Sequence, residues 1–214
     1  MPFGFRTAAQ GSRDVAALAG QLGYTYSRTD PGNVLGLPFR LFGQRDPSVK
    51  VRDFVSGRHG GQPAQLFELD GRTDEASRHG RGIGISVALP TDLTCAVVGI
   101  PAAFPPISIT RRIGSAVLLR DTDEVQFESD DFNRAFRVHC ASEKCAFSLI
   151  DGRMMQWLLT QPIPFVVIEL AGPYWLAAMP DIMPSGWPVL LSLYDTFGAN
   201  VPAVALSSFP PPTN

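Results

Sequence analysis

The feature that most constrains the fold is a long, nearly uncharged segment in the middle of the chain. Residues 83–109 carry one acid, Asp92, and no base, so the segment is long enough to cross a membrane as a helix. It also contains four prolines, Pro90, Pro101, Pro105 and Pro106. Proline removes a backbone donor and breaks helices. We therefore predict two apolar strands joined by a proline-rich turn, and no membrane-spanning segment.

Short apolar or alternating runs between turn residues predict further strands, and helical spacing predicts a few helices. The expected strands are residues 24–27, 49–57, 64–70, 83–90, 94–100, 107–111, 115–120, 124–128 and 136–140, with a hairpin of 164–170 and 174–178 across the "AGP" turn. The expected helices run from a Ser12 cap to Gly23, over 142–150 and 152–160, and from Pro188 to Gly198.

This pattern has many strands and few helices, and the two do not alternate as in βαβ units, which favours the α+β class. We expect an antiparallel β-sheet core of about 8–10 strands with about three or four short helices. One domain is expected over residues 11–205, after an N-terminal arm of residues 1–10 and before a proline-rich tail of residues 206–214. The polar, glycine-containing segment 71–82 is expected to be the most mobile internal part.

The composition is apolar for a chain of 214 residues, with 45% hydrophobic and 18% charged residues. This balance predicts that a protein partner, a second copy or a lipid surface covers part of the molecule. The net charge of −2 gives no basic patch, so nucleic acid is not an expected partner. An odd number of cysteines and the absence of a secretory signal favour a cytoplasmic location, with peripheral contact at the inner membrane as the alternative.

Residues with chemical potential are present but lack the spacing of known sites. His139 and Cys140 point to opposite sides of a strand, so they and Cys145 are not expected to hold a metal. The glycines near His59 and His79 lack the order of a phosphate-binding loop, and no serine elbow is present. We predict no catalytic residue, no metal and no cofactor.

Five segments occur in an order that resembles a family of uncharacterised actinobacterial proteins. They are "GYTYS", "VSGRHGGQPAQLFELD", "VQFESDDFNRAFRVHC", "DGRMMQWLL" and "FVVIELAGPYWLA". The family shares an F-N-R-x-F-x-V segment followed by an R-M-M-x-W-L-L helix. The resemblance implies no catalytic residue. Many members carry N-terminal membrane helices, and this sequence departs from them by showing none, so the resemblance does not extend membrane anchoring to this chain.

The helix expected over residues 152–160 has an unusually wide apolar arc. Met154, Met155, Trp157, Leu158 and Leu159 cover about 200° of its circumference. One hypothesis is that the helix is sandwiched within the core. The other is that it contacts a partner through the candidate residues Met154, Met155 and Trp157, together with the nearby Trp175 and Trp187.

The sequence thus favours a non-catalytic binding or assembly module. One alternative is an accessory or carrier factor at the surface of the inner membrane or cell envelope, and another is a cofactor-free enzyme with residues 71–82 as a lid. A flat apolar patch would favour the module, and a dry, open apolar groove would favour the lipid carrier. Buried polar groups that converge in a pocket would favour the enzyme.

Overall fold

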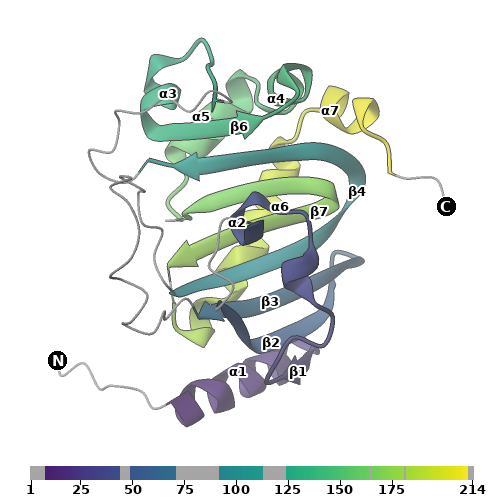
Figure 1. The fold of residues 1–214 in the computed structure, drawn as a ribbon, viewed down its shortest axis with the longest axis vertical. Coiled ribbons are helices and arrows are strands. Elements are labelled where there is room, and N and C mark those ends of the chain that lie inside the picture. Colours follow the sequence, from purple (N-terminus) through teal and green to yellow (C-terminus); the bar gives the residue numbers. More distant parts are fainter. Residues whose placement is uncertain are drawn as a thin grey trace.

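The computed structural model describes residues 8–43, 49–70, 92–112, 124–163, 165–180 and 182–211, which are organised around one antiparallel sheet (Figure 1). Its strands are β1 (Thr25–Ser27), β2 (Lys50–His59), β3 (Gln62–Asp70), β4 (Asp92–Arg111), β5 (Glu124–Val125), β6 (Phe136–Cys140) and β7 (Val167–Pro180). The predicted α+β class and the antiparallel core are confirmed. The strands expected over 83–90 and 115–120, and the segment 71–82, lie outside the described residues.

The described residues hold more helices than expected. They are α1 (Ala8–Leu22), α2 (Arg40–Gly43), α3 (Asp130–Ala135), α4 (Glu143–Leu149), α5 (Gly152–Thr160), α6 (Pro188–Asn200) and α7 (Ala203–Ser208), with 3-10 turns η1 (Val34–Gly36) and η3 (Pro184–Gly186). Helices α2, α3 and α7 were missed because four to six residues are too few to show helical periodicity. None of the helices in the described ranges has the length and apolar character needed to cross a membrane.

Side-chain caps explain where several helices begin. Ser129, Ser142 and Asp151 accept hydrogen bonds from the backbone N–H groups of Phe132, Cys145 and Met154, at 3.2, 3.2 and 2.8 Å. The Ser12 cap expected for α1 is wrong, because the helix already begins at Ala8. Alanine and glutamine are good helix formers, and Gln10 donates to Asp14 one turn later, so the helix extends upstream.

The two longest strands fold back on themselves (Figure 1). Strand β7 turns at Gly172, whose φ of 56° suits glycine, and the N–H of Val166 donates to the carbonyl of Ala178 at 2.8 Å. The expected hairpin across "AGP" is therefore present within one strand. Strand β4 bends around this turn, with register shifts between Gly99 and Ile107 where three of the prolines lie.

The strand pairing gives the order across the sheet. It runs β1, β2, β3, the first half of β4, the second half of β7, the first half of β7, the second half of β4, β6 and β5. The hairpin of β2 and β3 has a tight turn at Gly60 and Gly61, both with positive φ. The residues on either side of this turn, which were expected to form a connector, therefore belong to the strands.

One face of the sheet packs against helices and forms the larger apolar core. Helices α1 and α3 to α7 all contribute to it, and the fully buried Trp175 and Trp187 lie within it. The turn of residues 101–106 contacts the residue that follows α7, since the Ala103 N–H donates to the Phe209 carbonyl at 3.0 Å. Burying a large aromatic side chain provides much of the stability of such a core.

The opposite face is covered over only one half. Residues 28–43, here called the strap, pass over β2, β3 and the adjoining halves of β4 and β7 (Figure 1). The strap contributes Phe39 and Phe42 to a second apolar cluster, in which the Phe42 and Phe67 rings lie 6.4 Å apart. The first half of β7 lies at the boundary, since its Val167 and Ala171 still belong to this cluster. The part of this face formed by β5, β6 and the second half of β4 has no such cover among the described residues.

Candidate functional site

The candidate site is a cavity of about 1070 Å³, here called the cleft, between the strap and the uncovered half of the sheet. Its floor comes from β4, β5, β6 and β7, and its sides come from the strap and from α4. Side chains that line it include Leu35, Leu37, Phe39, Phe42, Ser108, Glu124, Gln126, His139, Glu143, Phe147 and Glu169. Ligand sites in proteins commonly enclose about 300–1,000 Å³, so the cleft is large enough for a small amphiphile.

A row of polar side chains crosses the floor of the cleft. Ser108 pairs with Glu169 on one side and with His139 on the other, and His139 pairs in turn with Glu124. Directly paired residues of neighbouring strands point to the same face of a sheet. The register therefore gathers a carboxylate, a hydroxyl, an imidazole and a second carboxylate from four strands.

Glu169 fastens the strap to the sheet. Its side chain is buried, with 3% of the residue exposed, and the Leu41 N–H lies 3.2 Å from each carboxylate oxygen. The Ser108 hydroxyl donates to Oε1 at 2.9 Å. Burial raises the pKa of Glu169, while these two hydrogen bonds lower it. The carboxylate thus accepts a backbone N–H that has no partner within the first turn of α2, and this contact holds α2 against the floor of the cleft.

The other end of the polar row is an ion-pair network. The Glu124 side chain is 2% exposed and pairs with Arg112 and with Arg137, whose Nε lies 3.2 Å from Oε2. Arg112 also donates from Nε to the carbonyls of Asn133 and Phe136, at 3.0 and 3.2 Å. Both arginines therefore pair with Glu124, and Arg112 also binds the backbone around α3.

His139 and Cys140 point to opposite sides of β6, as predicted. His139 lies in the polar row, whereas Cys140 and Cys145 are buried in the helix-covered core. The hydrogen bond between the two thiols lowers the pKa of Cys140 to about 7 and raises that of Cys145. Within the described ranges, no three His, Cys, Asp or Glu residues are grouped in a way that could hold a metal ion.

The other histidine within the described residues lies away from the cleft. His59 Nε2 is 2.8 Å from Asp195 Oδ1, which ties the β2–β3 hairpin to α6. His79 lies outside the described residues.

The predicted partner residues lie mostly inside the protein. Met154, Trp175 and Trp187 are fully buried, and Met155 is 7% exposed. Trp157 is half-buried, with its ring 5.9 Å from that of Phe197. Helix α5 is thus sandwiched, the first of the two hypotheses, and contact of Trp157 with a partner stays a prediction. The large apolar side chains exposed among the described residues are instead Phe147, Met183, Val204 and Leu206.

Sequence reasoning missed the polar row. Glu169 did carry a signal, because it is the lone charged residue between Ile163 and Pro180. A single acid in an apolar strand indicates a specific internal partner. Ser108 had no such signal, since its neighbours Glu169 and His139 become neighbours only through strand pairing.

Comparison with solved structures shows a shared fold. The crystal structure of the mycobacterial trehalose monomycolate transport factor A, TtfA, matches 94% of this chain and 98% of that chain, with a TM-score of 0.65 and 14% sequence identity. No protein-family model and no curated protein matches the sequence. At this coverage and TM-score, the likeness shows that the two chains share one overall fold.

Proposed function

We propose that this protein is a non-catalytic accessory factor in the transport of a lipid of the cell envelope, working at the surface of the inner membrane. The observation that carries the proposal is the likeness to a trehalose monomycolate transport factor over 94% of this chain. The matched region covers 94% of this chain and 98% of the crystallised chain, so the likeness concerns the whole of the fold described above.

The cleft supports a binding role. It is neither a flat apolar patch nor a dry apolar groove, because polar strand residues form its floor and apolar strap residues form one side. Such a mixed surface suits a molecule that has both a polar and an apolar part. A carrier or accessory factor needs such a surface to hold its lipid or to present it to a partner.

One observation favours an enzyme as the second candidate, namely Ser108 beside His139 and a carboxylate in the cleft. However, the Ser108 hydroxyl donates to Glu169, which already binds the Leu41 N–H. A serine nucleophile instead gives its proton to a histidine base. We expect a fluorophosphonate probe to leave Ser108 unlabelled, and stoichiometric labelling there would favour the enzyme.

A protein partner or a second copy is part of the proposal. The exposed Val204 and Leu206 lie on α7, next to α4, which carries the exposed Phe147 (Figure 1). These side chains are better placed for contact than the buried tryptophans. An apolar contact of this kind, with a membrane surface, a protein partner or a second copy, would account for the low charge of the chain.

Depletion of the protein in its native host tests the proposal. Newly made envelope lipids are labelled with radioactive acetate, and the inner-membrane and outer fractions are compared by thin-layer chromatography. We expect one lipid class to accumulate in the inner membrane and to fall in the outer fraction, with restoration by the wild-type gene. Unchanged distribution of every lipid class after full depletion would contradict the proposal.

A further inference from the structure

We propose that the cleft binds an amphiphile whose headgroup is uncharged and rich in hydroxyl groups. The inference rests on the proposed function and names the class of ligand for its cleft. The headgroup would lie over Ser108 and His139, and the alkyl chain would lie along the strap.

The strap provides the apolar side of the cleft. Leu35 and Leu37 are half-buried, so part of their side chains remains available, whereas Phe39 and Phe42 behind them belong to the apolar cluster. At the other side, Phe147 is 51% exposed and lines the same cavity. An alkyl chain placed here would gain about 25 cal/mol for each Å² of apolar surface removed from water.

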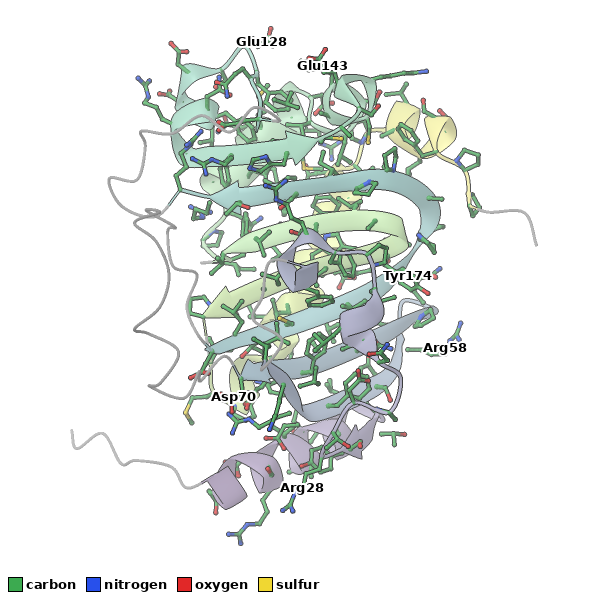
Figure 2. The ribbon with its side chains drawn as sticks, viewed as in Figure 1. Arg28, Arg58, Asp70, Glu128, Glu143 and Tyr174 are labelled. Carbon is green, nitrogen blue, oxygen red and sulfur yellow. The ribbon has the colours of Figure 1, made fainter. Side chains whose placement is uncertain are left out.

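The charges of the cleft select against an anionic headgroup. The lining residues within the described ranges include Glu124, Glu143 and Glu169 but a single arginine, Arg40. Arg112 and Arg137 are close by but pair with Glu124. Figure 2 shows Glu143 and Glu128 together at this end of the molecule, with Arg28 at the opposite end. Arg40 lies close enough to Glu169 to lower the pKa of that carboxyl group. A phosphate would therefore meet three carboxylates and one arginine that already interacts with one of them.

The polar floor instead matches hydroxyl groups. A hydroxyl both donates and accepts, so it can donate to a carboxylate or to the Ser108 oxygen and accept from the amide of Gln126. Ser108 uses its proton for Glu169, which leaves its oxygen lone pairs for a ligand donor. Carboxylates, amides, imidazoles and hydroxyls together form a surface on which several hydroxyl groups of one sugar can bind.

The test uses the full chain and probes with one C12 chain but different headgroups, all below their critical micelle concentrations. Dodecyl maltoside carries uncharged hydroxyls, dodecyl phosphate carries an anion, and dodecyltrimethylammonium carries a cation. Isothermal titration calorimetry and native mass spectrometry measure affinity and stoichiometry. We expect dodecyl maltoside to bind one to one, and about tenfold or more tighter than dodecyl phosphate. Equal or tighter binding of either charged probe, or no binding of dodecyl maltoside, would overturn the inference.

Variants locate the site. Ser108→Ala should weaken dodecyl maltoside binding several-fold, and Leu37→Ser should weaken all the C12 probes that bind. His59→Ala, a histidine outside the cleft, serves as the control and should leave affinity unchanged. Circular dichroism checks that each variant is folded. The site can also be located in the wild type with a dodecyl maltoside analogue that carries a photoreactive diazirine on its alkyl chain. We expect this probe to label the strap. Labelling confined to α7 would contradict the proposed site.

The two proposals can fail separately. If the cleft variants restore lipid transport in depleted cells while the wild type binds none of the probes, the accessory role stands and the ligand class is wrong. If the wild type binds dodecyl maltoside in the cleft but depletion leaves every envelope lipid in place, the ligand class stands and the transport role is wrong.

Discussion

The strap-covered half and the cleft half of one sheet face differ in chemistry, although β4 and β7 run through both. In the covered half these strands present Leu93, Cys95, Val97, Leu176 and Ala178. In the cleft half they present Ser108 and Glu169, beside His139 of β6, while Val167 and Ala171 of β7 still belong to the apolar cluster. An apolar surface must be covered to remain in a folded protein, whereas polar groups that pair across strands can face a cavity. The comparison shows that one strand can serve as packing surface at one end and as binding surface at the other.

Glu169 connects the two halves. It belongs to the polar row, and its carboxylate accepts the Leu41 N–H of the strap that covers the apolar half. The position of the strap therefore depends on the contact between Glu169 and Leu41 as well as on the apolar cluster between the strap and the sheet. Four predictions test this division, beginning with the largest effect.

Phe67→Ala should have the largest effect, because the side chain is fully buried beneath the strap beside Phe42 and Phe54. Removing a buried phenyl ring leaves a cavity and costs about 3–5 kcal/mol of unfolding free energy. Urea denaturation followed by circular dichroism measures this loss. A cost below about 1 kcal/mol would show that the strap does not pack on this half of the sheet.

Arg112→Met should cost less, about 1.5–3 kcal/mol, because Glu124 keeps Arg137 but loses a charged hydrogen-bond partner. The same denaturation experiment measures it. Arg134→Met is the matched control, since its pair with Asp131 is on the surface, with side chains 71% and 79% exposed. Solvent screens a surface pair, so Arg134→Met should change the unfolding free energy little, and equal losses in the two variants would contradict the importance of the cleft network.

Glu169→Gln should cost about 1–2 kcal/mol, because the amide can accept with only one of its two polar atoms. The variant should also loosen the strap locally. Hydrogen exchange at the Leu41 amide, which now donates to both carboxylate oxygens, should become faster, while exchange in α5 stays unchanged. Uniformly faster exchange throughout the chain would mean that Glu169 stabilises the whole fold rather than the strap.

The pH dependence of Glu169 should be the smallest effect. Burial raises the pKa of Glu169 above its ordinary value of 4.5, so the folded protein binds this proton more tightly than the unfolded chain. Its contribution is fully present below the ordinary value and is lost as pH rises through the raised pKa. Unfolding free energies of wild type and Glu169→Gln, measured from pH 4 to pH 8, should show the wild type losing stability relative to the variant. A relative gain over this window would contradict a raised pKa.

Local features were predictable from the sequence. Glycines with positive φ form the β2–β3 turn at Gly60 and Gly61 and the β7 turn at Gly172, and both hairpins were expected from these residues. Helical spacing over residues 152–160 predicts α5, and Pro188 begins α6 as expected. Each of these signals lies within a few residues, because turns, caps and periodicity depend on neighbouring side chains.

Only the tertiary structure decided which segments meet. Leu41 and Glu169 are 128 positions apart, and Ser108 and Glu169 are 61 apart. Trp175 and Met154 were candidates for a partner surface under one of two hypotheses, and the packing of α5 and α6 on the sheet buries both side chains. Local patterns show that a residue is apolar or polar and which side of its own element it occupies. The order of the strands determines which residue lies beside which. The pairing of β4 with both β6 and β7 depends on how the whole chain buries its apolar surface, which no local pattern contains.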